Sequence, residues 1–195
     1  MRAALAFIIV LLLGTPLVVL GQDPAFIEAQ IKRWAEEVRR NPNDFETLAA
    51  IGSAYGKLGH HTTAIEYFEK ALAINPSYAE AYLGMAASYG SLGRLNDKIE
   101  ACKKAIALKP DYTEAYGNLG SALSKAGRFT ESVQALKEAV RLKPDFADAH
   151  LLLGLAYLSL GDRNLAVKQS QTLNRLNPSL AKQLTEIINN VSGQR

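Results

Sequence analysis

Residues suited to metal binding or nucleophilic catalysis are scarce in this sequence, which contains three histidines and one cysteine among 195 residues. His60 and His61 are adjacent, and two imidazoles could coordinate a metal ion such as zinc. Both are expected in a turn, however, where neighbouring side chains diverge, and no third ligand is close in the sequence. We therefore predict no metal site and no cofactor.

The other candidates for chemistry are better explained by packing. His150 and Cys102 both fall at positions expected to face the interior of a helical array. A single cysteine forms no internal disulfide, and a buried thiol lacks the electropositive exposure of reactive ones; dimerisation through Cys102 is the alternative. Residues 52–57 resemble a phosphate-binding loop, but the match is one residue short, lacks the Ser or Thr and follows no strand. We predict that the protein is not an enzyme.

The dominant feature of the sequence is a period of 34 residues, on which prolines recur with glycines between them. The prolines are Pro42, Pro76, Pro110, Pro144 and Pro178, and the glycines are Gly59, Gly93, Gly127 and Gly161. Self-similarity at such a period indicates an array of small structural units. Function is then expected in a surface that repeats along the array.

Each period contains two helices, as residues 79–112 illustrate. Apolar residues recur at helical spacing on both sides of Gly93. Glycine enters the left-handed conformation without a Cβ clash, so Gly93 is expected to end the first helix. Pro110 ends the second helix, because proline lacks an N–H and restricts the preceding residue.

The starts of the helices also carry a signal. One residue after each proline lies an oxygen acceptor suited to a helix N-cap, and an acidic residue follows three positions later, as in a capping box. The predicted N-caps are Asn43, Ser77, Asp111 and Asp145, and their acidic partners are Glu46, Glu80, Glu114 and Asp148.

The residues at fixed offsets in this period resemble the tetratricopeptide repeat family. Counted from residues 45, 79, 113 and 147, position 8 is occupied by Gly52, Ala86, Gly120 and Gly154, and position 11 by Tyr55, Tyr89, Leu123 and Tyr157. The resemblance implies an all-α fold, a right-handed α-solenoid of helix-turn-helix repeats, with four full repeats at 45–78, 79–112, 113–146 and 147–180. Position 20 departs from the family pattern at Lys98, whose amine we expect to reach water along an apolar stem.

Single helices are expected to cover both ends of the array, since a terminal repeat would otherwise expose an apolar face. Residues 22–44 are predicted to form an N-terminal capping helix with Trp34 on its apolar side. Residues 181–195 are predicted to form a C-terminal capping helix and tail, with Ser179 as the N-cap.

Residues 1–21 differ in character from the rest of the chain. Arg2 precedes an uncharged apolar run over 3–20, which is typical of a signal peptide, or of a membrane anchor if it is not cleaved. We therefore predict an exported protein of the bacterial periplasm, with secretion or membrane anchoring as alternatives. The formal net charge of +3 is too small to indicate nucleic-acid binding.

In the tetratricopeptide repeat family the first helix of each repeat lines a concave groove, and the resemblance implies the same arrangement here. The candidate partner-binding residues are Lys57, Leu83, Ala87, Asn118, Ser121, Lys125, Leu151, Leu152, Leu155 and Leu158. The first part of this groove is small and nearly featureless, whereas the last repeat offers four leucines. The leucines either anchor an apolar segment of a partner or are partly covered by the C-terminal helix.

The predicted function is that of a non-enzymatic scaffold that binds a protein or peptide in this groove. One alternative is a homodimer formed through the leucine-rich end. Another is an assembly factor for an exported or membrane complex, since residues 31–71 also resemble the repeat segment of bacterial cytochrome c maturation factors. Some family members hold a C-terminal carboxylate through Lys, Asn and Arg side chains, but Ala49, Ser53 and Leu152 occupy those positions here, so that activity is not expected.

Overall fold

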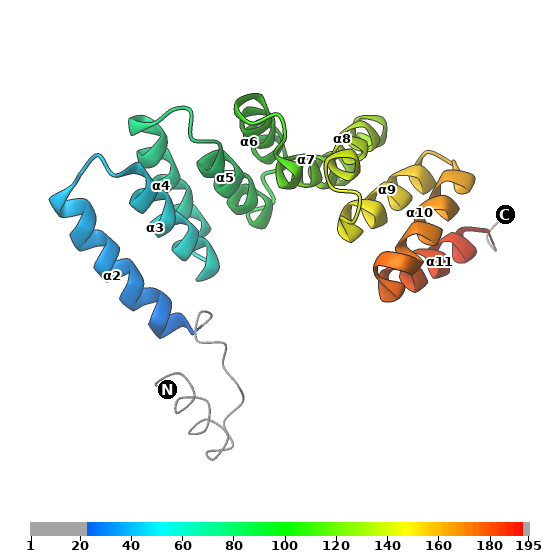
Figure 1. The fold of residues 1–195 in the computed structure, drawn as a ribbon, viewed down its shortest axis with the longest axis horizontal. Helices are drawn as coiled ribbons and strands as arrows, with labels where there is room; N and C mark the ends of the chain where they lie inside the picture. The colour runs from blue at the N-terminus through cyan, green and yellow to red at the C-terminus, as the bar shows by residue number, and fades with distance from the viewer. Residues whose placement is uncertain (1–22, 193–195) are drawn as a thin grey trace, which may run out of the picture.

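The computed structural model describes residues 23–192 and contains ten helices within that range. They form an open arc with α2 at one end and α11 at the other (Figure 1). The helices are α2 (Pro24–Arg40), α3 (Phe45–Lys57), α4 (His61–Ile74), α5 (Ala79–Ser91), α6 (Leu95–Leu108), α7 (Thr113–Lys125), α8 (Phe129–Leu142), α9 (Ala147–Ser159), α10 (Arg163–Leu176) and α11 (Pro178–Ser192).

The helices pack as consecutive antiparallel pairs: α3 with α4, α5 with α6, α7 with α8, and α9 with α10. Each second helix also packs against the first helix of the next pair. In the middle of the arc, α5 and α7 lie on the inner side and α6 and α8 on the outer side (Figure 1). The prediction of an all-α solenoid of helical pairs is confirmed.

The turn inside each pair has the same backbone geometry. All four periodic glycines have positive φ, for example 82° at Gly59. The N–H of His60 donates to the carbonyl of Tyr55 at 2.9 Å, and the N–H of Gly59 donates to the carbonyl of Gly56 at 3.1 Å. This is the Schellman pattern of a helix C-terminus, which satisfies carbonyls that the helix itself leaves unpaired.

The predicted N-caps are wrong by one residue, because the residue after each proline belongs to the turn that precedes the helix. Just before the second repeat, the N–H of Tyr78 donates to the carbonyl of Asn75 at 3.2 Å, so Pro76 and Ser77 form the centre of a four-residue turn. Tyr78 is then the N-cap and makes no side-chain capping bond. Its ring packs instead at 5.1 Å, edge to face, against Phe45, the first residue of the same repeat.

The same shift occurs in the other repeats. The N-caps are Asp44, Tyr112 and Phe146, in place of Asn43, Asp111 and Asp145. Of these three N-caps, Asp44 alone makes a side-chain cap, by accepting from the N–H of Thr47 at 3.0 Å. An aromatic residue at the helix entrance therefore replaces the predicted capping box in the later repeats.

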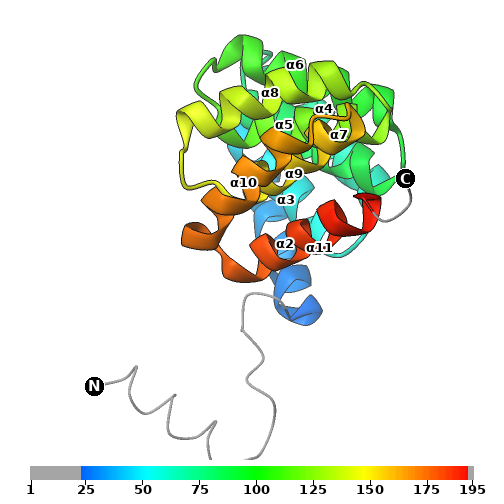
Figure 2. The ribbon, with the colours of Figure 1, turned by 90° about the vertical axis from the view of Figure 1, so that its right-hand side faces the viewer.

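The two end helices cover the ends of the arc. At the N-terminal end, α2 buries Ile27 and Ile31 against α3. At the other end, α11 packs against both α10 and α9, and Figure 2 views these three helices from that end. Helix α11 begins at Pro178, and the side chain of Asn177 accepts from the N–H of Leu180 at 3.2 Å, so the prediction of Ser179 as the N-cap is wrong.

The predicted signal peptide or anchor at 1–21 lies outside the described residues. From Pro24 to Ser192, no helix is both long enough and apolar enough to cross a membrane.

Candidate partner-binding groove

The predicted groove residues lie on the four inner helices, α3, α5, α7 and α9, and none of them is fully buried. Lys57, Ala87 and Lys125 are exposed. The other candidates are half-buried, and Asn118 is tied to its own helix, because its amide donates to the carbonyl of Glu114 at 3.0 Å. The inner face is therefore accessible along its length, with few charged groups on it.

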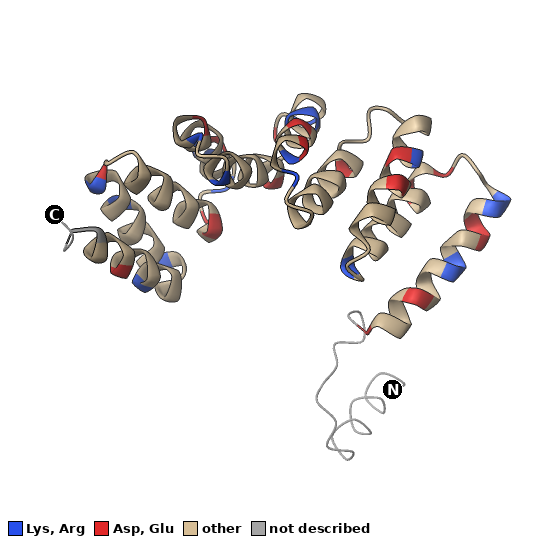
Figure 3. Cartoon of the chain, turned by 180° about the vertical axis from the view of Figure 1, so that it is seen from behind, with Lys and Arg blue, Asp and Glu red and all other residues tan. Residues whose placement is uncertain are grey.

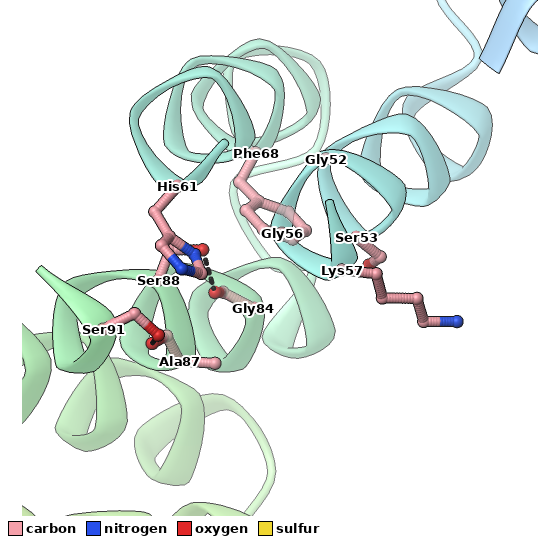
Figure 4. A pocket seen from close by; sticks show the side chains of 10 residues that line it. All are labelled: Gly52, Ser53, Gly56, Lys57, His61, Phe68, Gly84, Ala87, Ser88 and Ser91. Carbon is pink, nitrogen blue, oxygen red and sulfur yellow. Dashed lines mark hydrogen bonds between the residues drawn. The ribbon is translucent and has the colours of Figure 1, made fainter. Parts of the chain in front are cut away.

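A pocket of about 300 Å³ opens on this face where the first two repeats meet. Helices α3, α4 and α5 contribute its walls (Figure 4). Its lining consists of Gly52, Ser53, Gly56, Lys57, His61, Phe68, Gly84, Ala87, Ser88 and Ser91. The pocket exists because small residues of α3 and α5 face each other there, so no side chain fills the space between the helices.

The floor of this pocket is the ring of Phe68, which points from α4 between α3 and α5 (Figure 4). A Cβ at Gly84 would lie 2.6 Å from Phe68 Cε1, so Gly84 makes room for the ring. Gly56 is different: a Cβ there would lie 3.9 Å from Ala64 Cβ and Ser88 Oγ, which is ordinary contact. Gly56 therefore leaves space in the pocket that no neighbouring atom occupies.

His61 gives the pocket an unsatisfied polar atom. Its side chain comes from the start of α4 and extends toward α5, where Ser88 is already bonded to the carbonyl of Gly84 at 3.1 Å (Figure 4). Among the described residues, the Nδ1 atom of His61 is buried and has no hydrogen-bond partner. Such an atom carries a free-energy cost, which marks this part of the pocket wall as imperfectly satisfied. Nothing in the sequence pointed to this role, since His61 was predicted to lie in a turn.

The leucines of the last repeat do not form an open apolar patch. Leu151, Leu155 and Leu158 are half-buried and pack against the apolar cluster that α10 and α11 form around Leu184. Leu152 faces the other way and lines a smaller hollow with Asn118 and Ser121. The C-terminal helix therefore covers part of the leucine surface, which is one of the two alternatives the sequence left open.

The stem of Lys98 is buried against α5. Only 9% of the residue is exposed, and its side chain crosses in front of Gly90 on α5. Burial lowers the pKa of the Lys98 amine, and the nearby positive charge of Lys125 lowers it further. The Nζ atom has no hydrogen-bond partner in the described part of the chain and is nevertheless not fully buried, which agrees with the expectation that the amine reaches water along a buried stem.

The residues that the sequence assigned to packing are buried. Cys102 is fully buried, and this burial raises the pKa of its thiol to about 12. His150 is 8% exposed; its Nε2 donates to the carbonyl of Pro144 at 2.9 Å, and its Nδ1 lies 2.8 Å from Gln169 Oε1. Each histidine nitrogen thus has a polar neighbour at hydrogen-bonding distance, which suits a structural role.

Positive and negative residues are interspersed along the arc, and neither sign dominates a face (Figure 3). On the inner helices, the acidic residues lie in the first turn and the lysines Lys57 and Lys125 at the last position. Acidic side chains are stabilising near the positive N-terminal end of a helix, and lysines are stabilising near its negative C-terminal end. The groove thus has acidic residues along one edge and two lysines, at the ends of α3 and α7, along the other.

Sequence models of the tetratricopeptide repeat match residues 45–78, 79–112, 101–134 and 147–180, and a further TPR repeat model matches 122–161. Together these matches run without a gap over 45–180. No curated protein sequence matches this chain.

Several solved structures share this fold. A crystal structure of MamA is 28% identical, covers 81% of this chain and 92% of its own, and superposes with a TM-score of 0.74. MamA from Desulfovibrio magneticus RS-1 is 24% identical and covers 79% of this chain and 87% of its own, with a TM-score of 0.73. TTC0263, a thermophilic TPR protein of Thermus thermophilus, is 22% identical and covers 83% and 90%, with a TM-score of 0.66.

Proposed function

Because this chain belongs to the tetratricopeptide repeat family, we propose that it is a scaffold that holds a segment of another protein in its concave groove. Repeat arrays of this kind present extended concave surfaces for binding. Family membership and the related folds support a protein-interaction role, which is typically non-enzymatic. The position of the bound segment within the groove is our own proposal.

The observation that carries the proposal is the pocket between α3, α4 and α5. It combines an apolar floor, unfilled volume beside Gly56 and the unpaired Nδ1 of His61. A side chain with an apolar body would fill this volume and pack on the Phe68 ring. We therefore assign this pocket as the anchor point for one side chain of the partner.

A homodimer through the last repeat has less support than binding in the groove. The packing of Leu151, Leu155 and Leu158 against the α11 cluster leaves less apolar surface there for a second copy. Light scattering of the purified protein distinguishes the two, because a strict monomer excludes the homodimer.

We also propose that the protein acts outside the cytoplasm. The support is the apolar run that follows Arg2 within residues 1–21. A C-terminal alkaline phosphatase fusion tests this, because that reporter is active only after export. An inactive but intact fusion would contradict the proposal.

Site-specific photo-crosslinking tests partner binding in the groove. A benzoylphenylalanine at Ser53 or Ser91, both exposed beside the pocket, is expected to capture a defined protein in the native host. The same probe at Glu66, on the exposed face of α4, is the control and should capture none.

A substitution that fills the pocket connects this capture to the proposed anchor. Gly56→Leu places its side chain in the empty volume and is expected to abolish the Ser91 crosslink. Ala107→Leu adds a similar apolar volume at an exposed position of α6 and should leave the crosslink intact. Equal crosslinking in both variants, with unchanged helicity, would refute the assigned anchor.

A further inference from the structure

A hollow of about 240 Å³ lies on the inner face where α7 and α9 meet, and side-chain oxygen atoms surround it. Glu114 and Asp148 contribute carboxylates from the first turns of the two helices. Asn118 and Ser121 line the hollow from the next two turns of α7. Within the described part of the chain, no lysine or arginine lines it.

These oxygen atoms have no partners among residues 23–192. Neither carboxylate forms an ion pair or a hydrogen bond there, and the hydroxyl of Ser121 forms no hydrogen bond. The amide nitrogen of Asn118 donates to the backbone carbonyl of Glu114 at 3.0 Å, which leaves the Asn118 Oδ1 atom as an acceptor. The preceding repeat differs, because Glu80 Oε1 lies 3.4 Å from Lys109 Nζ.

An aromatic ring forms part of the wall of the hollow. Phe146, the N-cap of α9, lies against α7 where a Cβ at Gly117 would be 3.0 Å from its Cε1 atom. The absence of a side chain at Gly117 therefore makes room for the ring beside the hollow. Lys143 Nζ lies 5.6 Å from the centroid of this ring, so the ring already has a cation for a neighbour.

The helix dipole accounts for a carboxylate in the first turn of each inner helix, but it does not account for the rest of the hollow. Gly117, Asn118 and Ser121 occupy positions 5, 6 and 9 of the third repeat. The equivalent residues are Ala49, Ala50 and Ser53 in the first repeat, Leu83, Gly84 and Ala87 in the second, and Leu151, Leu152 and Leu155 in the fourth. The third repeat alone combines a glycine, an amide and a hydroxyl at these positions, so packing of the repeat does not require them.

We propose that this hollow is a subsite for an arginine side chain of the bound protein segment. A guanidinium group has five N–H donors and no acceptor, which complements a lining of acceptor oxygens. Its planar fork can bind the carboxylates of Glu114 and Asp148, and its face can lie on the ring of Phe146. The subsite rests on the proposed function, since it is part of the same groove, but it is separate from the anchor pocket beside Gly56.

An NMR titration of the protein, expressed from its full-length sequence, tests the subsite without the natural partner. The probe is the blocked peptide acetyl-Gly-Ala-Arg-Ala-Gly-amide, compared with twins that carry citrulline or lysine in place of arginine. We expect the arginine peptide to shift the amide signals of Ser121 and Asp148 saturably. The citrulline peptide has the same shape without the charge and should bind at least about fivefold more weakly. The lysine peptide should bind between the two, because its ammonium group lacks the planar fork.

Three variants separate the hollow from general attraction to acidic residues. Glu114→Gln removes one carboxylate and should weaken binding of the arginine peptide about threefold. Glu46→Gln is the matched control, because Glu46 has the same position in the first repeat and is also exposed, and it should leave binding unchanged. Ser121→Leu fills the hollow but keeps both carboxylates, and it should reduce the arginine peptide to the level of its citrulline twin. The fourth repeat has Leu155 at this position, so the fold accommodates a leucine there.

The subsite is wrong if the arginine peptide causes no saturable shift, or if the citrulline or lysine peptide binds as tightly. It is also wrong if Glu46→Gln weakens binding as much as Glu114→Gln does, or if Ser121→Leu has no effect, since either result would indicate attraction to the acidic edge as a whole. Crosslinking from Ser53 and Ser91 depends on α3 and α5 and can succeed in each of these cases. Failure of the subsite is therefore distinguishable from failure of the groove.

Discussion

Two glycines on the inner helices provide a matched test of the packing, because alanine would be crowded at one and not at the other. In the middle of α7, a Cβ at Gly120 would stand 2.7 Å from Leu136 Cδ2 and closer still to Leu136 Cγ. Leu136 is fully buried, so it has little space into which to move. In the last turn of α3, a Cβ at Gly56 would meet its nearest neighbours at 3.9 Å.

The expected effects follow from two opposing contributions. Replacing a helical glycine with alanine raises the free energy of unfolding by about 0.5–1 kcal/mol. Overpacking lowers it by about 1–3 kcal/mol, and Gly120 belongs at the upper end because the clash involves the branch carbon of a buried leucine. Gly120→Ala should therefore lower the free energy of unfolding by about 2 kcal/mol, and Gly56→Ala should raise it by up to about 1 kcal/mol.

Thermal unfolding followed by circular dichroism and calorimetry measures the difference. About 3 kcal/mol between the two variants corresponds to about 6–12 °C in Tm for a domain of this size. The Leu136→Val change should also be less harmful in the Gly120→Ala background than in the wild type, as a double-mutant cycle would show. Equal melting temperatures for the two alanine variants would mean that Leu136 does not fill the space in front of Gly120, and the packing of α7 on α8 would be wrong.

Three further predictions follow from burial. Lys98→Met should raise Tm at pH 7, because the folded protein disfavours the charged form of Lys98 and lowers its pKa. As the pH rises from this lowered pKa to about 10.4, the pKa of an unfolded lysine, the wild type loses the charge on folding, so the difference in Tm between the two proteins should shrink. Cys102, whose burial raises its thiol pKa to about 12, should react with Ellman's reagent at pH 8 only as fast as the protein unfolds, and fast labelling of the folded protein would contradict its burial. Truncation after Asn177 removes buried Leu184 and Ile188, which should lower the free energy of unfolding by up to about 3–6 kcal/mol and cause self-association in light scattering; a monomer with unchanged Tm would show that α11 is not needed as a cover.

The architecture could be predicted from the sequence because its signals are local and repeated. A positive φ at Gly93 and the end of α6 just before Pro110 depend on a few neighbouring residues, and each was predicted from residue type alone. The same reasoning failed for Ser77, which lies inside a proline turn, while Tyr78 takes the N-cap position and packs its ring on Phe45 at the other end of the repeat. A contact between residues so far apart in the chain is not visible in the local sequence.

The candidate site was predictable only in outline, for the same reason. The inner face followed from the repeat phase, but the unpaired Nδ1 of His61 depends on how α4 and α5 meet. The partial cover over Leu155 depends on α11, which lies outside the four repeats. Lys98 was recognised as a departure from the family pattern, yet its burial could not be foreseen without the position of Gly90.

The seams between the two helices of each repeat suggest how a uniform scaffold could recognise one partner. The same pair of positions, 12 and 20, meets once in every repeat, but its chemistry changes each time. The pairs are Gly56 with Ala64, Gly90 with Lys98, Ser124 with Ser132, and Leu158 with Ala166. They provide, in order, an empty apolar volume, an amine on a buried stem, a pair of bonded hydroxyls and an apolar contact with the end helix. Specificity in such a groove would depend on the order of these four features along the partner, since each of them alone is too simple to distinguish one protein from another.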